Sequence, residues 1–237
     1  MKDTEDSRLH EALPRLVRQV DPRPAPDHHH YLALSMSIID RWMRAHAVQA
    51  VRGTLLDYGC GGQPYREVFA PYVERYIGAD VVAAAGIKLD LELIPGEPVP
   101  LPDQSVDTVL STQTIEHVPD VDAYLAECRR VLRPNGTLVV TAPMHWRHHE
   151  APYDFLRFTR FGLTRLLEKH GFAIKNLEPC GGVYVLMGQI FLDHLAERGI
   201  KARIVYRIVN WIAPFLDRKY QDMEDTLNWQ CLASKVP

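Results

Sequence analysis

Short apolar runs alternate along the chain with segments in which apolar residues recur every three or four positions. Apolar runs bounded by glycine or proline favour buried strands, and the longer periodic segments favour helices that cover one face of a sheet. Helices are predicted at Ser35–Val48 and Glu67–Tyr72, from a cap at Asp120 to Leu132, and at Phe161–His170 with a cap at Thr159. Strands are predicted at Thr54–Asp57, Arg75–Ala79, Ile87–Leu89, Val106–Ser111, Thr137–Thr141, Phe172–Leu177 and Thr226–Ser234.

Strands that alternate with helices build a mostly parallel sheet with helices on both faces. The expected fold is therefore α/β, a doubly wound, Rossmann-like sheet of seven strands. Residues 1–50 are expected to form an N-terminal helical cap, with an irregular helix over 1–20 and a stiff Pro-rich linker at Asp21–Asp27. In the main domain, 51–237, residues 143–158 predict a lid, and residues 181–222 predict a helical insertion before the last strand.

A glycine-rich turn, Asp57-Tyr-Gly-Cys-Gly-Gly-Gln-Pro64, follows the first predicted strand. Glycine lets the backbone approach a ligand closely, and the N–H groups of a helix start face that ligand. A dinucleotide fingerprint would need glycine where Pro64 stands, and a phosphate-binding loop would need a Lys-Ser/Thr pair, which is absent. Asp57 suits a positively charged ligand, and Asp80 stands at the spacing that binds ribose hydroxyls. The turn thus predicts a nucleoside cradle and disfavours a nicotinamide-dependent oxidoreductase.

These motifs resemble the class I S-adenosylmethionine-dependent methyltransferases, especially the type 11 group. The resemblance covers about residues 50–180 and departs at Gln63, where many members have glycine. It is carried by Asp57-Tyr-Gly-Cys-Gly, Asp80, Asp90, Leu101–Leu110, Glu116-His117-Val118 and Val131–Leu138. It implies S-adenosylmethionine as cofactor, bound by Asp57, Gly59, Cys60, Gly61, Gly62, Asp80, Asp90, Leu91, Thr112, Gln113 and His117.

The predicted lid is rich in histidines and acids, and it leaves a strand end directly over the expected cleft. A hydroxyl acceptor needs a base to take its proton, and histidine suits that role near neutral pH. His145 is the first candidate because it lies closest to the strand end; His148 and His149 come next, and Asp154 could orient one of them. The alternative is a lid held by Asp154 and Arg157 with no chemical role. The spacing matches no helix-borne zinc motif, so no metal site is predicted.

The sequence therefore favours methyl transfer to a hydroxyl of a small molecule or a glycan-type acceptor. Two alternatives remain open. One is N-methylation of an amine on a sugar or metabolite, and the other is a non-catalytic scaffold that binds S-adenosylmethionine without turnover.

Composition limits the partners. The 237 residues are 46% hydrophobic with a net charge of −3, so the broad basic surface of a nucleic-acid-binding protein is absent. The four cysteines lie far apart, which argues against a disulfide framework. The charged start predicts no signal peptide, so the cytoplasm is the expected location. Residues 201–218 form a cationic amphipathic segment, which either packs as a cap on the core or a partner subunit or contacts a membrane surface. The sequence leaves open whether the protein forms a homodimer.

Overall fold

The computed structural model describes residues 28–221 and 223–237, so the expectations for 1–27 lie outside it. A single seven-stranded sheet has the order β3-β2-β1-β4-β5-β7-β6, and β7 alone runs antiparallel to its neighbours. This confirms the predicted Rossmann-like α/β fold. The strands are β1 (Thr54–Tyr58), β2 (Arg75–Asp80), β3 (Leu91–Glu92), β4 (Val106–Thr112), β5 (Leu132–Pro143), β6 (Phe172–Cys180) and β7 (Asn228–Lys235).

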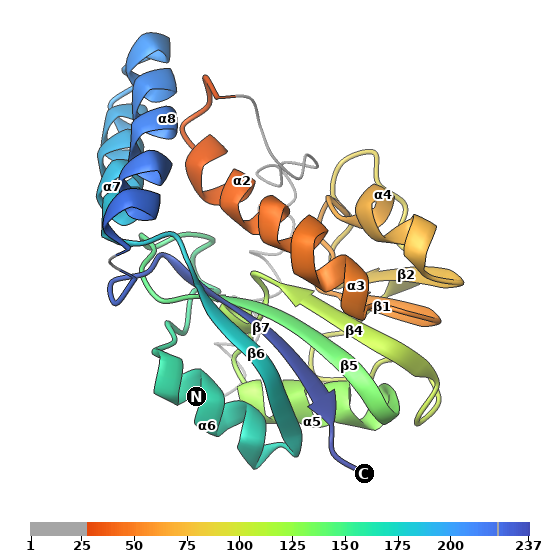
Figure 1. Ribbon diagram of the computed structural model, residues 1–237. Coiled ribbons are helices and arrows are strands. Elements are labelled where there is room, and N and C mark those ends of the chain that lie inside the picture. The colour runs from red at the N-terminus through yellow and green to blue at the C-terminus, as the bar shows by residue number, and fades with distance from the viewer. Residues whose placement is uncertain (1–27, 222) are drawn as a thin grey trace, which may run out of the picture.

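Helices cover both faces of the sheet (Figure 1). A continuous helical rod made of α2 (Ala33–Trp42), the π-helical turn η1 (Met43–Ala47) and α3 (Val48–Ala50) lies on one face. On that same face, α4 (Arg66–Phe69) continues into the 3₁₀ turn η2 (Ala70–Tyr72). On the other face lie α5 (Val121–Val131) and α6 (Arg160–Lys169), whose first turns are capped by Asp120 and Thr159 as the sequence predicts.

The sheet separates the two larger apolar clusters of the core, and a third, smaller one lies between α2 and the helices of the 181–222 insertion. Along β1, Leu55 belongs to the cluster beneath α2 and α4, and Leu56 belongs to the cluster beneath α5 and α6. Both side chains are fully buried. Successive residues of a strand point to opposite faces, and a parallel strand in the middle of a sheet is buried on both. This is why β1 appears in the sequence as an uninterrupted apolar run that leads directly into the glycine turn.

The prediction for the third strand is wrong by a few residues. Strand β3 is Leu91–Glu92, paired with the end of β2, whereas the sequence pattern predicted Ile87–Leu89. Asp90 explains the shift, because its backbone N–H donates to the Gly78 carbonyl and its carboxylate accepts from the Gly78 N–H. These two bonds hold the chain against β2 at Asp90, so the pairing that defines β3 begins only after this residue.

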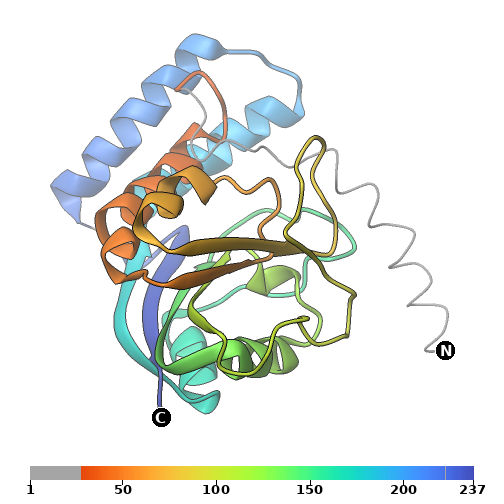
Figure 2. The same ribbon diagram turned by 90° about the vertical axis from the view of Figure 1, so that its right-hand side faces the viewer.

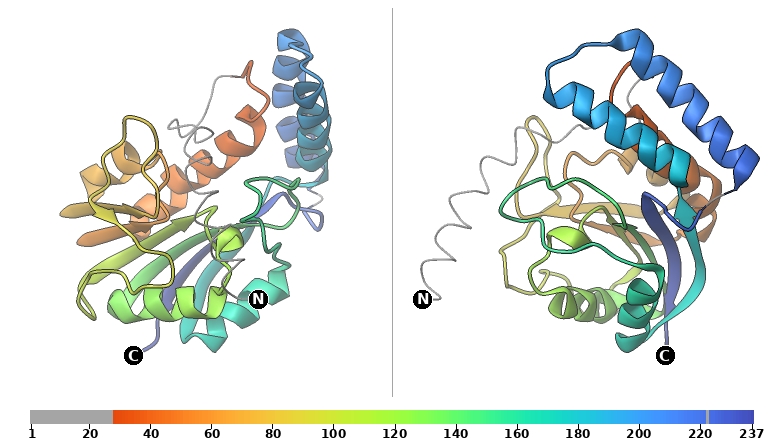
Figure 3. Two further views of the ribbon diagram at one scale, coloured as in Figure 1. Left: turned by 180° about the vertical axis from the view of Figure 1, so that it is seen from behind. Right: turned by 90° about the vertical axis from the view of Figure 1, so that its left-hand side faces the viewer.

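Residues 181–222 contain a helical hairpin of α7 (Val183–Glu197) and α8 (Arg203–Tyr220), which rises beyond the β6–β7 end of the sheet (Figure 3). Figure 2 shows the hairpin on the same side of the sheet as α2, and Gln189 of α7 donates to the Tyr31 carbonyl and accepts from the Ser35 N–H. In the described parts of the chain, no helix is both long and apolar enough to cross a bilayer.

The first turn of α7 is capped from a distance. Its N-cap residue, Gly182, has no side chain, and the carboxylate of Asp217 on α8 takes over that role. Asp217 accepts hydrogen bonds from the N–H groups of Gly182 (2.6 Å), Tyr184 (2.9 Å) and Val185 (3.3 Å). A carboxylate at a helix N-terminus satisfies unpaired N–H groups and complements the helix dipole. Asp217 thus joins the two helices of the hairpin.

We expect Asp217→Ala to lower the free energy of unfolding by about 1–2 kcal/mol, because it removes the only side-chain cap that α7 receives from the described residues. Asp217→Asn keeps one acceptor oxygen, so its free energy of unfolding should fall by less than that of Asp217→Ala. Urea unfolding followed by circular dichroism measures both. The exposed Asp103, paired with Arg130 at the surface, provides the control. If Asp103→Ala destabilised the protein as much as Asp217→Ala, the capping role would be contradicted.

Candidate active site

A cavity of about 250 Å³ opens where β1, β2 and β4 end. In an open α/β sheet, ligands bind at the carboxyl ends of the strands. The glycine turn after β1 forms one wall, and residues after β2 and β4 form the others. The lining residues are Gly59, Cys60, Gly61, Gly62, Pro64, Asp80, Val82, Ala84, Thr112, Gln113, Thr114, His117 and Glu150. This cavity is called the cradle below.

Gly59 is required by the geometry of the cradle. Its φ is +84°, a conformation that side chains rarely adopt, and a Cβ at this position would collide with the side chain of Thr114. The Thr114 hydroxyl lies 3.2 Å from the Gly59 carbonyl oxygen, to which it can donate. The turn after β1 and the turn after β4 therefore touch through a residue that only glycine can supply.

Asp80 organises the opposite wall. One carboxylate oxygen accepts from the Gly61 N–H (2.7 Å) and the other accepts from the Val81 N–H (2.7 Å). Burial raises the pKa of Asp80, although the three backbone N–H groups around it oppose that shift. Asp80 therefore lines the cradle, as predicted, and also fixes the path of the glycine turn.

Three predicted cofactor contacts lie behind the cradle walls. The Asp57 carboxylate is buried and accepts a hydrogen bond from the Tyr76 hydroxyl. Burial raises its pKa to about 7, against the lowering effect of Tyr76. Asp90 is engaged by the Gly78 N–H and by Arg66, and Leu91 packs half-buried against the core. In the structure these residues support the cradle, and none of them lines it.

The lid leaves β5 and divides its histidines between two places. His145 Nδ1 lies 2.9 Å from the Thr226 carbonyl oxygen, away from the cradle lining. His148 is exposed, and His149 stacks edge-on against His117 with 4.6 Å between ring centroids. Asp154 accepts from the His149 backbone N–H (3.0 Å) and forms a two-point ion pair with Arg157. Asp154 thus holds the lid backbone, and only His149 of the three lid histidines reaches the rim of the cradle.

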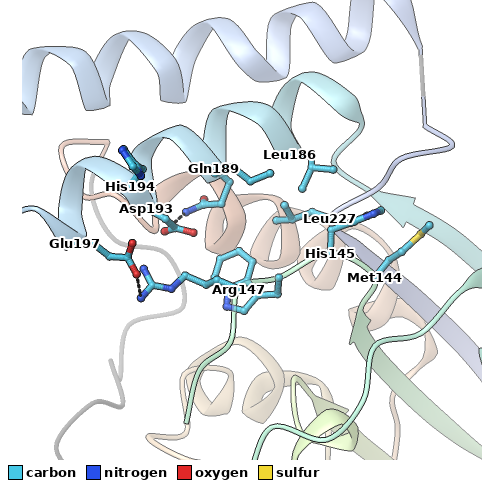
Figure 4. A pocket seen from close by; sticks show the side chains of 11 residues that line it. Met144, His145, Arg147, Leu186, Gln189, Asp193, His194, Glu197 and Leu227 are labelled. Atoms are coloured by element: carbon cyan, nitrogen blue, oxygen red, sulfur yellow. Dashed lines mark hydrogen bonds and ion pairs between the residues drawn. The ribbon is translucent and has the colours of Figure 1, made fainter. Parts of the chain in front are cut away.

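His145 lines a second cavity of about 440 Å³ between the lid and α7 (Figure 4). Two polar pairs stand on its wall: Arg147 of the lid with Glu197 of α7 (2.6 Å), and Gln189 with Asp193 (2.9 Å). Trp146 also lines this cavity and lies edge-on to His149. The rings of Trp146, His149 and His117 therefore connect the second cavity to the cradle. Its lining residues are Met144, His145, Trp146, Arg147, Leu186, Gln189, Ile190, Asp193, His194, Glu197 and Leu227.

Sequence reasoning missed several residues at this site. Glu150 and Val82 line the cradle without having been predicted to do so, whereas Thr114 lines it at the turn where the sequence predicted a cofactor contact. Glu116 is completely buried, and burial raises its pKa to about 8. A signal for Glu116 existed, since it stands in the Glu-His-Val stretch of the resemblance; no local pattern indicated Glu150, which the lid delivers from 34 residues further along the chain.

Comparison with known proteins now identifies the domain. A family model described as a methyltransferase domain matches residues 56–140, which include the cradle wall from Gly59 to Gly62 and the turn after β4. The chain carries a class I S-adenosylmethionine-dependent methyltransferase domain. The predicted family and cofactor are confirmed.

Two curated relatives and one solved structure show the extent of the similarity. A probable S-adenosylmethionine-dependent methyltransferase from Mycolicibacterium smegmatis is 31% identical over 57% of this chain and 60% of its own length. A ubiquinone biosynthesis O-methyltransferase from Sinorhizobium medicae is 32% identical over 36% of this chain and 39% of its own length. The chain thus spans less than two thirds of either relative. The crystal structure of the [4+2]-cyclase SpnF has a TM-score of 0.61 at 22% identity, covering 97% of this chain and 94% of that one. This last likeness shows the fold alone.

The cradle fits the methyltransferase cofactor. Gly59, Gly61 and Gly62 line the cavity with backbone alone, so the chain can approach a ligand closely there. Asp80 brings a carboxylate to the wall opposite the turn, at the end of β2, where ribose hydroxyls are bound in folds of this type.

The buried Asp57 predicts a dependence of stability on pH. Its pKa is about 7 in the folded protein against 3.8 in the unfolded chain, so the folded state holds this proton more tightly. The contribution of Asp57 to the free energy of unfolding is fully present below about pH 4. It is lost as the pH rises to about 7, by at most about 1.4 kcal/mol per pH unit. Between pH 5 and pH 7, the free energy of unfolding of Asp57→Asn should therefore fall by about 1–3 kcal/mol less than that of wild type. Urea unfolding without cofactor measures the difference.

Tyr76→Phe is the matched control for this prediction. The Tyr76 hydroxyl stabilises ionised Asp57, so its removal should steepen the loss of stability between pH 5 and pH 7. Parallel stability curves for wild type and Asp57→Asn across this range would show that Asp57 does not titrate as described.

Proposed function

We propose that this protein transfers the methyl group of S-adenosylmethionine to a hydroxyl of a small-molecule or glycan-type acceptor. The observation that carries the proposal is a pair of cavities that share the lid as a wall. The cradle fits the cofactor. The second cavity suits a polar acceptor, because Arg147, Gln189, Asp193 and Glu197 offer donors and acceptors for hydroxyl groups beside the apolar surface of Leu186 and Ile190.

The cofactor supplies a methyl group already activated on a positively charged sulfur. The protein has to align the acceptor oxygen behind that methyl group, exclude water and accept a proton. His145 is suited to the last task. A ring nitrogen that donates to a carbonyl carries the hydrogen, so the bond from Nδ1 to the Thr226 carbonyl leaves Nε2 free to accept the proton of the acceptor hydroxyl. The Arg147–Glu197 pair joins the lid to α7 and helps to close the second cavity.

Methylation of oxygen is favoured by this histidine and by the partial similarity to an O-methyltransferase. An amine acceptor that arrives unprotonated would need no base, and a scaffold would bind cofactor without releasing product. Both alternatives therefore differ from the proposal in how they respond to loss of the His145 side chain.

We expect His145→Ala to lower kcat about 10²–10⁴-fold with hydroxylated acceptors, because general-base catalysis contributes about that much. Its affinity for S-adenosylhomocysteine should stay within twofold of wild type, since His145 does not line the cradle. Release of S-adenosylhomocysteine measures turnover, and calorimetry measures binding. His46→Ala, an exposed histidine on η1, is the control and should match wild type in both. Full turnover by His145→Ala would remove the proposed base, and absence of any affinity of wild type for S-adenosylhomocysteine would contradict the proposed function.

The surface of α8 supports a further part of the proposal, contact with an anionic membrane surface. The side chains of α8 that face the protein include Tyr206, Asn210, Ala213 and Asp217. The face turned to solvent is the apolar one, with Trp211 73% exposed. Its other members are Ile204, Ile208, Ile212 and Phe215, and the exposed arginines of the helix are Arg203, Arg207 and Arg218. An apolar face bordered by arginines suits a bilayer with anionic headgroups.

Wild type is expected to co-sediment with vesicles of phosphatidylglycerol and phosphatidylcholine, and Trp211→Glu should lose most of that binding because it places a charge in the apolar face. Glu224→Gln, outside α8, is the control for unspecific charge effects. Equal sedimentation of wild type and Trp211→Glu, or no sedimentation of either, would exclude the membrane contact.

A further inference from the structure

Three potential metal ligands meet at the rim of the cradle, and the proposed mechanism uses none of them. Glu116 and His117 come from the 3₁₀ turn η3 (Ile115–His117) after β4, and His149 comes from the lid. One ligand atom from each residue lies within 4.8 Å of the other two. Elements far apart in the sequence thus bring two imidazoles and one carboxylate to a single point.

The Glu116 carboxyl group lies in the interior without hydrogen-bond donors among the described residues. Its side chain is completely buried, and neither carboxylate oxygen has a hydrogen-bond partner. Arg157 does not fill that role, because its guanidinium is bound by Asp154 at 2.5 and 2.9 Å. A buried carboxylate without donors costs several kcal/mol unless it is protonated or a cation compensates for its charge. A cation bound at this point would stabilise the ionised form of Glu116.

His117 is oriented as a ligand. Its Nδ1 lies 2.7 Å from the Tyr153 carbonyl oxygen, to which it donates, so Nε2 carries the free lone pair. That Nε2 is 3.8 Å from Glu116 Oε1 and 3.6 Å from Glu150 Oε2. An imidazole whose second nitrogen donates to a carbonyl is the usual arrangement of a metal-binding histidine, because the hydrogen bond fixes the tautomer and the ring.

His149 completes the set. Its Nδ1 is buried, has no hydrogen-bond partner, and lies 3.4 Å from Asp154 Oδ2. The His149 backbone N–H donates to the same carboxylate, so Asp154 fixes the lid backbone beside the ring. The rings of His149 and His117 meet edge-on without a hydrogen bond between them. A cation between the two rings would give their unpaired nitrogens a partner.

We propose that Glu116, His117 and His149 bind a divalent first-row cation, with Glu150 on the open side as a fourth ligand. Two imidazoles with a carboxylate suit Zn²⁺ and similar ions, whereas Mg²⁺ and Ca²⁺ prefer oxygen ligands alone. His117 and Glu150 also line the cradle. The cation would therefore stand at the boundary of the cofactor site, between it and the lid.

This position gives the cation a role that rests on the proposed function. A cation at the cradle rim would bind the acceptor oxygen and favour its ionised form, as divalent cations do for bound water. The hydroxyl proton passes to Nε2 of His145, the oxygen forms a bond to the methyl carbon, and the sulfur keeps the electron pair of the broken carbon–sulfur bond. The acceptor group would then be a hydroxyl that can also coordinate a metal ion.

Calorimetric titration of chelator-treated protein with Zn²⁺ tests the site. Wild type should bind one equivalent, and Glu116→Gln and His149→Ala should each weaken binding at least tenfold. His148→Ala removes the neighbouring exposed histidine and should leave binding unchanged. Because Glu116 is buried, unfolding of each variant is followed in parallel, and the absorption spectrum of the Co²⁺-loaded protein reports on the ligand set independently. We expect that spectrum to change in His149→Ala and to persist in His148→Ala.

Three outcomes would overturn the metal site: no binding of Zn²⁺ by wild type, equal weakening by His148→Ala and His149→Ala, or a Co²⁺ spectrum that is unaltered in folded His149→Ala. Affinity for S-adenosylhomocysteine without added metal separates the two proposals. If S-adenosylhomocysteine binds and Zn²⁺ does not, only the metal site fails. If Zn²⁺ binds and S-adenosylhomocysteine does not, the metal site stands and the proposed function fails.

Discussion

The pair of hydrogen bonds from backbone N–H groups to Asp80 holds the cradle in shape. The glycine turn has no side chains with which to fix its own path, since Gly59, Gly61 and Gly62 contribute only backbone. Asp80 compensates from the next strand by accepting from the Gly61 and Val81 N–H groups. Because β1 and β2 are parallel and in register from Thr54 to Tyr58, the acid that ends β2 always arrives beside the turn that ends β1. Sheet pairing therefore produces the shape of the cradle.

Buried carboxylates concentrate around this site. Asp57 lies behind the turn, and burial raises its pKa to about 7. Glu116 lies at the rim of the cradle, and burial raises its pKa to about 8. A core built for stability alone would place apolar side chains there. Asp57 has Tyr76 as a hydrogen-bond partner, whereas Glu116 has none in the described chain. This difference points to a function for Glu116 that involves a further group.

The helical hairpin inverts the usual arrangement of an amphipathic helix. Asn210 and Asp217 of α8 face the protein, where they bind the His28 carbonyl and cap α7, while Trp211 faces solvent. The polar residues are buried because they satisfy backbone groups at the start of α7 and at His28 and His30. The apolar residues are then left on the outer face, where a membrane or another apolar surface is the environment that would suit them.

Much of the fold was determined by local sequence. The apolar runs, the caps at Asp120 and Thr159 and the glycine turn predicted the layers, the sheet and the family, because these signals depend on residues close together in the chain. The exception, β3, is only two residues long, and its position depends on the bonds between Asp90 and Gly78 across two strands. Tertiary structure alone decided which predicted contacts line the cradle, which cavity receives His145, and how His149 meets Glu116 and His117. Those distances depend on how the lid folds back over the sheet, and spacing along the chain carries no information about that.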